Sequence, residues 1–170
     1  MDDLERLMAN FCAPDDGASV QRKLNLLLEL DRYHDPRTVP FLTDGLTDPD
    51  EAVEVRIECA RRLRRGRLTD ADRPWVAEAL VDVLAQTEHD HLRLEAVLTL
   101  GDFTDILCVQ TALGTLALRL SEPVDVRYTA FTSVERSGPT PLTVQLFRQL
   151  AADETLGPSA RSVLRLWRVV

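Results

Sequence analysis

The sequence predicts an all-α protein built from stacked helix pairs. Four arginines recur at nearly one spacing, with gaps of 37, 34 and 34 residues: Arg56, Arg93, Arg127 and Arg161. Each follows a turn that carries acidic residues, and each begins an apolar helical stretch. A period of this length is typical of helical repeats, in which each pair buries its apolar face against the next. Aromatic residues make up only 5% of the chain, which favours helix packing over a sheet sandwich.

Proline, glycine and capping residues indicate where the helices begin and end. Pro141 follows Thr140, and a first-turn proline loses no helix hydrogen bond while the threonine can cap free amides. Thr69 and Asp72 have the spacing of a capping box ahead of Pro74. Four glycines fall where helices are expected to stop: Gly66, Gly101, Gly138 and Gly157.

This punctuation predicts about ten helices in five pairs. The first helices of the pairs are expected at 2–12, 37–46, 73–86, 105–120 and 140–152. The second helices are expected at 18–32, 52–65, 91–101, 124–136 and 158–168. A chain of 170 residues can bury a sizeable core, so the whole length, 1–170, is predicted to form a single repeat domain.

The positions around the repeated arginines have the pattern of a packed layer. The residue before each arginine is apolar: Val55, Leu92, Val126 and Ala160. Three residues after the arginines come Cys59, Ala96, Ala130 and Leu164, and seven after come Leu63, Leu100, Val134 and Arg168. Small residues let helices approach closely and larger ones fill the next layer, so these columns are expected in the core.

The second helix pair carries the most regular repeat. The run that begins at Asp35 and enters its first helix reads Asp-Pro-Arg-Thr-Val-Pro-Phe-Leu. Its turn is Asp48-Pro-Asp, and its second helix contains the run Val-Arg-Ile-Glu-Cys-Ala-Arg-Arg-Leu from Val55. These runs resemble the HEAT repeat, in the short bacterial form related to the phycobilin-lyase repeats, and the likeness extends more loosely over nearly the whole chain. The resemblance implies a right-handed α-α superhelix, or solenoid, of about five pairs.

In such repeats the recurring arginine is expected to work structurally. Its guanidinium can reach a carboxylate of the preceding turn and carbonyl groups of a neighbouring repeat. The candidate carboxylates are Asp48 or Asp50, Asp90, Asp125 and Asp153. The alternative is a ladder of arginines that binds an anionic ligand.

Charge and composition narrow the classes of function. The net charge of −8 disfavours binding to nucleic acid, because phosphates would be repelled. The acidic N-terminus, MDDLERLM, is unlike a secretory signal, and the longest apolar run, 106–120, is too short and polar to span a bilayer. A cytoplasmic protein without membrane contact is therefore expected. The three cysteines, Cys12, Cys59 and Cys108, are expected to be buried reduced thiols.

One basic cluster stands out in this acidic chain, at the end of the helix expected over 52–65. Five arginines lie there: Arg61, Arg62, Arg64, Arg65 and Arg67. The helix dipole favours positive charge at that end of the helix. Glu58 lies three and four residues before Arg61 and Arg62, the spacing of ion pairs along a helix, and Glu54 lies one turn earlier. Both observations indicate that the cluster is a structural surface. The alternative is a docking site for an acidic peptide or phosphate. The residues of that partner-binding hypothesis are Arg61, Arg62, Arg65, Glu54 and Glu58.

The helix expected over 105–120 is apolar on nearly all sides. Its inner face is predicted to hold Ile106, Val109, Leu113, Leu116 and Leu120. The opposite side holds Leu107, Thr111, Gly114 and Leu118. Such a helix is normally covered, either by its own neighbours or by a partner. The second alternative predicts a self-association surface and a homodimer.

No pattern of residues points to catalysis. The run Glu88-His89-Asp90-His91 holds metal-ligand side chains, but neighbours on one turn cannot all face one ion. No phosphate loop or nucleophile elbow occurs, so no catalytic, metal or cofactor residue is expected.

The expected function is thus a non-catalytic module that binds another protein or serves as a scaffold. The resemblance adds two alternatives. Some HEAT-like proteins are lyases or chaperones that act on pigment-binding or other client proteins, and others are DNA-repair glycosylases. The acidic charge and the scarcity of aromatic residues argue against the glycosylase.

Overall fold

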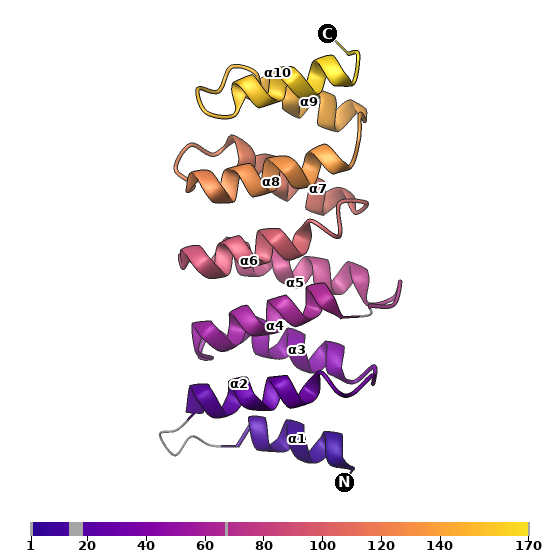
Figure 1. Cartoon of the computed structure of the whole chain (residues 1–170), viewed down its shortest axis with the longest axis vertical. Helices are drawn as coiled ribbons and strands as arrows, with labels where there is room; N and C mark the ends of the chain where they lie inside the picture. The colour runs from indigo at the N-terminus through magenta and orange to yellow at the C-terminus, as the bar shows by residue number, and fades with distance from the viewer. Residues whose placement is uncertain (1, 14–18, 67, 170) are drawn as a thin grey trace. The chain divides into compact units, whose positions relative to one another are not determined.

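The structure is a computed structural model that describes residues 2–13, 19–66 and 68–169. Within these ranges the chain forms ten α-helices and no β-strand (Figure 1). The predicted all-α class is confirmed. None of the helices in the described ranges is long and apolar enough to cross a membrane.

The helices alternate as the repeat predicts. The first helices of the pairs are α1 (Asp3–Phe11), α3 (Thr38–Thr47), α5 (Arg73–Gln86), α7 (Leu107–Leu118) and α9 (Pro141–Leu150). The second helices are α2 (Ser19–Leu30), α4 (Val53–Arg65), α6 (Asp90–Leu100), α8 (Val124–Arg136) and α10 (Gly157–Leu166). Every expected helix is present, and no helix end shifts by more than about two residues from its predicted position, the usual uncertainty of a helix boundary.

The contacts divide the chain into two compact units, Met1–Ala79 and Leu80–Val170, with the boundary inside α5. Each unit has its own packed helices and is described by itself. The single domain expected over 1–170 stays a prediction.

In the first unit, α1 packs on α2, and α4 packs on both α2 and α3. Leu27, Leu46 and Leu63 are fully buried among these helices. Cys59 is buried as predicted, and burial raises the pKa of its thiol to about 12. Cys12 follows the last turn of α1 and is exposed, so the expectation of a buried thiol is wrong there.

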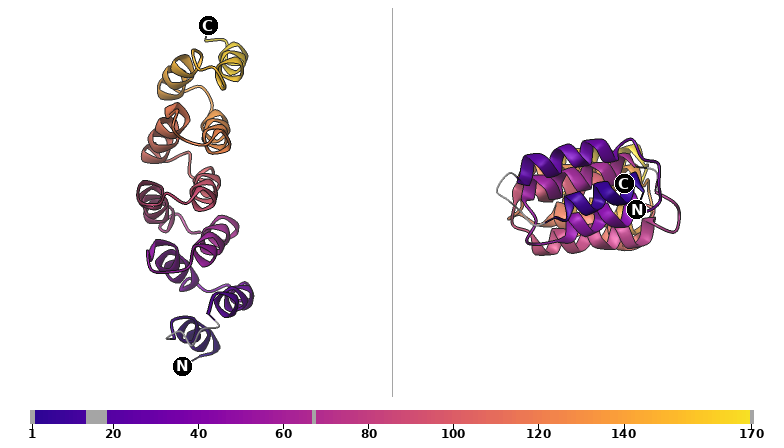
Figure 2. Two further views of the ribbon diagram at one scale, coloured as in Figure 1. Left: turned by 90° about the vertical axis from the view of Figure 1, so that its left-hand side faces the viewer. Right: turned by 90° about the horizontal axis from the view of Figure 1, so that it is seen from below.

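In the second unit, α7 and α9 form one layer, and α6, α8 and α10 form the other (Figure 2). The core contains Phe103, Phe131 and Phe147, all buried. The ring of Phe147 lies between its neighbours, with centroids 4.8 Å from Phe131 and 4.9 Å from Trp167. Cys108 lies on the exposed side of α7, so the buried thiol expected there is also wrong.

The columns predicted around the repeated arginines are confirmed as core. The positions before the arginines are buried in both units: Val55, Leu92, Val126 and Ala160. So are the small residues and the larger ones that follow them, Cys59, Ala96, Ala130, Leu63, Leu100 and Val134. Arg168, the last member of the second column, is exposed, because it lies beyond the end of α10.

Several of the predicted helix ends are confirmed in detail. The amide of Thr143 donates to Thr140 Oγ1 at 3.2 Å, and the amide of Thr140 donates to Thr143 Oγ1 at 2.8 Å, which forms a capping box for α9. Gly138 has a φ of 77°, a left-handed conformation that glycine adopts without strain, and it follows the end of α8. Gly157 was expected to end a helix, but it is the first residue of α10.

Loss of the α9 cap gives a first testable result. Thr140→Ala removes the acceptor of the Thr143 amide, so we expect the free energy of unfolding to fall by about 1 kcal/mol. Urea denaturation followed by circular dichroism measures this change. Thr155→Ala, in an exposed turn, is the matched control and should leave stability within about 0.5 kcal/mol of the parent. An equal effect of both variants would show that the cap does not stabilise α9.

A cluster of surface charges joins the start of α1 to the turn before α3. Arg37 donates to Asp35 at 2.8 Å, to Asp2 at 2.9 Å and to Glu5 at 3.2 Å. Hydrogen bonds from the Arg37 side chain and backbone lower the pKa of Asp35 to about 2. Because the pKa of Asp35 is lower in the folded state than in the unfolded chain, its ionised carboxylate stabilises the folded state at pH values above the unfolded-state pKa of about 3.9. This stabilisation is lost as the pH falls toward 2.

The largest cause of the lowered pKa of Asp35 is the Arg37 guanidinium, beside a smaller effect of the Arg37 backbone amide. Arg37→Met should raise this pKa from about 2 toward the ordinary value for aspartate, because the charged hydrogen-bond donor is gone. A pH titration of the side-chain carboxyl signal by NMR measures it. Arg6→Met, which removes the ion pair with Asp3, is the control and should leave Asp35 unchanged. An unshifted Asp35 in the Arg37 variant would contradict the assigned cause.

Candidate functional site

The repeated arginines bind carbonyl groups inside their own helix pairs. Arg56 Nε donates to the carbonyl of Leu46 at 2.9 Å, and Arg127 Nε donates to that of Ala117 at 3.0 Å. Arg161 donates to the carbonyl of Ala151 in the same way. In each case the acceptor lies ten residues earlier, at the C-terminal end of the first helix of the pair. These carbonyls have no partner within their helix, and the helix dipole favours a cation there.

The Arg93 side chain makes the most extensive contacts of the four. Its Nη1 donates to the carbonyls of Leu84 at 2.7 Å and Thr87 at 2.8 Å. Its Nε and Nη2 donate to the two carboxylate oxygens of Glu122 at 3.2 and 2.6 Å. Both side chains are buried, so Arg93 is neutralised inside the protein.

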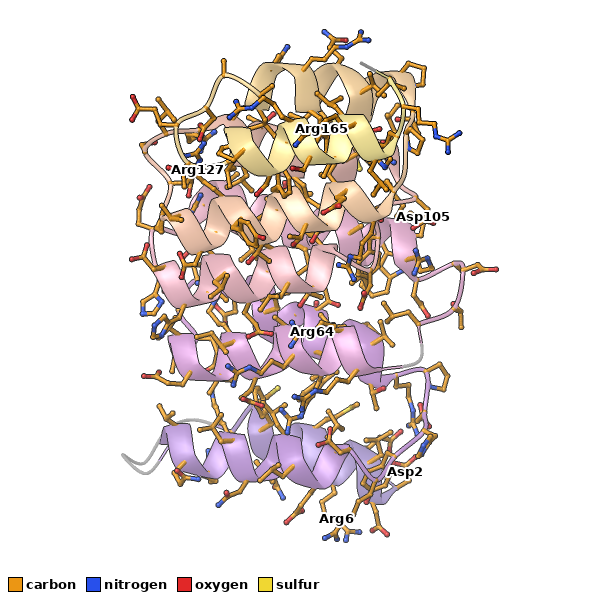
Figure 3. All side chains as sticks on the ribbon, turned by 45° about the horizontal axis from the view of Figure 1, so that its top comes forward. Asp2, Arg6, Arg64, Asp105, Arg127 and Arg165 are labelled. Atoms are coloured by element: carbon orange, nitrogen blue, oxygen red, sulfur yellow. The ribbon has the colours of Figure 1, made fainter. Side chains whose placement is uncertain are left out.

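The carboxylates that bind these arginines differ from those predicted. Arg93 pairs with Glu122, and Arg127 pairs with Asp153, each in the turn of the following helix pair (Figure 3 labels Arg127 in α8). The prediction of acids in the preceding turn is wrong for these two arginines, because their guanidinium groups point toward the next layer. Burial opposes ionisation of Asp153, but amide donors and Arg127 lower its pKa overall. Because Arg93 and Arg127 are buried and paired with carboxylates, these two of the four arginines are not available to a ladder that binds an anion.

The basic cluster in α4 is largely satisfied within the first unit. Arg62 is 9% exposed, and it donates to the carbonyl of Leu27 at 3.0 Å and to Glu58 at 2.5 Å. Arg61 pairs with the same Glu58 at 2.7 Å. Arg65 and Glu54 are exposed. The contacts therefore favour the structural interpretation for Arg61, Arg62 and Glu58, while Arg67 lies outside the described residues.

The face of α7 predicted to self-associate divides into an exposed and a covered part. Leu107 is 68% exposed, and Thr111 is exposed with its hydroxyl donating to the carbonyl of Leu107 at 3.0 Å. Gly114 is buried, and a Cβ there would lie 3.1 Å from Leu146 Cδ2 of α9. Leu118 is half-buried. Helix α9 thus covers part of this face, as the first alternative predicted.

The opposite face of α7 enters the core in its middle, whereas Ile106 before its start is half-buried and Leu120 after its end is exposed. Val109, Leu113 and Leu116 are buried as expected. Leu120 is 78% exposed, because α7 ends at Leu118 and the chain turns away before Leu120.

A pocket of about 170 Å³ lies between α7 and α9 in the second unit. Thr111, Gly114 and Leu118 line it, and these are three of the four residues predicted to self-associate. Leu142 and Leu146 form its apolar wall on α9. The described lining residues carry no charge, so the pocket is apolar inside with amide and hydroxyl groups around it.

The amide groups of the pocket come from three glutamines. Gln145 and Gln149 are exposed on α9, whereas Gln110 of α7 donates to the carbonyl of Thr104 at 2.6 Å. The sequence interpretation missed the α9 residues. The repeat itself could have found them, because Gln145 and Gln149 lie 34 residues after Thr111 and Thr115, one period along the array.

The described ranges, 2–13, 19–66 and 68–169, contain no group of three or more His, Cys, Asp or Glu side chains that could hold a metal ion. The rings of His89 and His91 lie 5.9 Å apart without a third ligand beside them.

The helix pairs define an all-α protein with a HEAT-like repeat fold. The structure of human deoxyhypusine hydroxylase in complex with glycerol is similar, with a TM-score of 0.57 and 16% sequence identity. The match covers 98% of this chain and 62% of that chain, so this chain spans less than two thirds of the enzyme. The sequence matches no protein-family model and no curated protein. At this identity the likeness shows the fold alone.

The comparison corrects the predicted function. A non-catalytic protein-binding or scaffold module was expected, with a lyase, a chaperone or a DNA glycosylase as alternatives, but the similar structure is a hydroxylase. The prediction treated the repeat as a sign of a non-catalytic protein. Stacked helix pairs supply only a framework, and activity depends on the side chains that the framework presents, so the inference from repeat to role is wrong.

Proposed function

We propose that this chain binds a small, uncharged molecule in the pocket between α7 and α9. The observation that carries the proposal is the uncharged apolar lining of a pocket of about 170 Å³. An apolar cavity of roughly 150 Å³ in another protein is large enough to hold benzene. A group the size of an aromatic ring or a leucine side chain therefore matches the space.

The polar groups around the pocket favour a ligand with one hydrogen-bonding end. Gln145 and Gln149 each offer amide donors and a carbonyl acceptor, and both are exposed. A charged group would lose water without gaining an ionic partner, which costs free energy. The pocket thus favours an apolar body carrying a hydroxyl or amide over a carboxylate or ammonium of the same size.

The test compares three probes of one shape. Benzyl alcohol should shift the amide NMR signals of α7 and α9, whereas benzoate and benzylammonium should shift them much less. Leu118→Asn places an amide in the apolar wall, so we expect about tenfold weaker binding of benzyl alcohol, the effect of losing roughly 1.4 kcal/mol of apolar contact.

Leu107→Asn is the matched control, because Leu107 is on the same helix but outside the pocket lining. It should bind benzyl alcohol as the parent does. Equal binding of all three probes, or an equal loss in both variants, would overturn the proposed ligand class.

The finer family and location are also part of this proposal. We infer a member of the short bacterial HEAT-like type, and the runs that begin at Asp35 and Val55 support this. We infer a cytoplasmic location, which the three free cysteines support, because thiols stay reduced in that compartment.

A protein partner at the α4 arginines and a homodimer through α7 stay predictions. Sedimentation velocity of Leu107→Glu beside the parent tests the homodimer, since a charge at this exposed position would prevent an apolar contact. Identical monomeric sedimentation of both proteins would remove it.

A further inference from the structure

A second concave site lies on the other side of the second unit, between α8 and α10. The groove has a volume of about 390 Å³. Tyr128, Phe131 and Glu135 line it from α8, and Ser159 and Ser162 line it from α10. None of these residues lines the pocket between α7 and α9. The groove is therefore independent of the small-molecule site proposed above.

An aromatic surface forms the wall of the groove on α8. Tyr128 is 49% exposed, and its ring stacks on that of Phe131 with a centroid distance of 5.9 Å and an interplanar angle of 17°. Phe131 is buried and packs in turn on Phe147. The core thus fixes the orientation of the tyrosine ring while much of the ring stays accessible. Such a ring can hold methylene groups and attract a cation.

A carboxylate lies further along the same face of the helix. Tyr128 and Glu135 are seven residues apart, so they lie on one face, about 10 Å apart along the helix axis. Glu135 is half-buried in the last turn of α8. In the part of the chain that the structure describes, its carboxylate has no hydrogen-bond or ion-pair partner. The negative end of the helix dipole adds to its attraction for a cation.

The nearby arginines leave this carboxylate unneutralised. Arg136 follows Glu135 in sequence, but its Nη2 donates to the carbonyl of Gly101 at 3.4 Å. Arg165 of α10 donates to Ser162 Oγ at 3.2 Å and makes no ion pair with Glu135 (Figure 3 labels Arg165). Arg165 is not among the residues that line the groove, so Glu135 is the one charged residue in the described lining.

We propose that the groove between α8 and α10 binds a primary alkylammonium group, with the alkyl chain on the exposed ring of Tyr128 and the ammonium at Glu135. A lysine side chain and a free monoamine share this chemistry, since each has a flexible apolar stem and one compact charge. The alkyl stem would cover the aromatic surface, and the ammonium would form an ion pair with the carboxylate of Glu135.

The experiment titrates the isotopically labelled full chain with two amines and one neutral probe. n-Butylammonium represents the free amine, the capped peptide acetyl-Gly-Lys-Gly-amide represents a lysine side chain, and n-butanol has the same stem without the charge. We expect the amines to shift the amide signals of α8 and α10, and n-butanol to bind at least about tenfold more weakly. If only one amine binds, that amine identifies the source of the ligand and the proposal stands.

Two substitutions test the assigned residues. Glu135→Gln keeps the shape but removes the charge, so amine binding should weaken at least about tenfold. Tyr128→Leu should weaken it about threefold to fivefold, because the alkyl stem loses the flat ring surface on which it lies. Glu154→Gln, at an exposed acid outside the groove, is the charge-matched control and should bind as the parent does. Thermal unfolding of each variant confirms that it is folded.

Three results would overturn the proposal. They are failure of both amines to bind, unchanged amine affinity in a folded Glu135→Gln variant, and binding of n-butanol as tight as that of n-butylammonium. Signal shifts confined to α7 and α9 would assign the amines to the other pocket and would equally exclude this site.

Discussion

Arg127→Met is expected to lower the free energy of unfolding by about 3 kcal/mol or more, the usual cost of breaking a buried ion pair by removing one partner. Arg127 is only 4% exposed, and its partner Asp153 is buried with it. The substitution leaves the Asp153 carboxylate without its cation and the Ala117 carbonyl without its donor. Methionine preserves the apolar stem of the side chain, so the change in the free energy of unfolding measures the loss of the polar contacts. Urea denaturation with an unchanged m-value measures it.

Arg161→Met is the control, because Arg161 has the same place in the repeat with a different burial. It is exposed and, among the residues that the structure describes, donates only to the Ala151 carbonyl. Its loss should cost about 1 kcal/mol or less. If the free energy of unfolding falls by the same amount in both variants, the stabilising contribution of Arg127 does not depend on its burial between helix pairs.

Arg62→Met is expected to cost about 2 to 3 kcal/mol in the first unit. The buried guanidinium joins the carbonyl of Leu27 in α2 to Glu58 of α4, and it also reaches Asp31 at 3.1 Å. Losing it frees a buried carbonyl and separates α2 from α4. The expected loss of stability is smaller than for Arg127→Met, because Glu58 keeps its ion pair with Arg61 and is not left without a cation. Chemical denaturation again gives the change.

Arg65→Met, three residues further along the same helix, is the matched comparison. Arg65 is exposed, so its replacement should change stability by no more than about 0.5 kcal/mol. A reversed order of the two variants would mean that Arg62 does not hold α2 against α4. It would also return Arg62 to the set of residues available for a partner.

The helices and the core columns could be predicted from the sequence because both depend on local periodicity. Pro141, Gly138 and the capping pair at Thr140 and Thr143 act within a few residues, so their positions set the ends of α8 and α9. Apolar spacing along one helix likewise indicates its buried face. The carboxylates that Arg127 and Arg93 bind lie 26 and 29 residues away, and local spacing does not determine them.

The candidate sites show the same division. The apolar outer face of α7 was visible in its own residues, but only the structure shows that Leu146 covers Gly114 and leaves a pocket beside Leu118. The groove at Tyr128 and Glu135 requires two helices that are separate in sequence. The role was harder still to predict, because the HEAT-like framework is shared with an enzyme and does not itself specify chemistry.

A double-mutant cycle on Arg93 and Glu122 tests the central claim, that the two buried repeat arginines, Arg93 and Arg127, join successive helix pairs. The cycle compares Arg93→Met, Glu122→Gln and the double variant by the free energy of unfolding. Because both side chains are buried and share two hydrogen bonds across 29 residues, we expect a coupling energy of about 2 kcal/mol. Additive effects, with a coupling energy below about 0.5 kcal/mol, would contradict the claim.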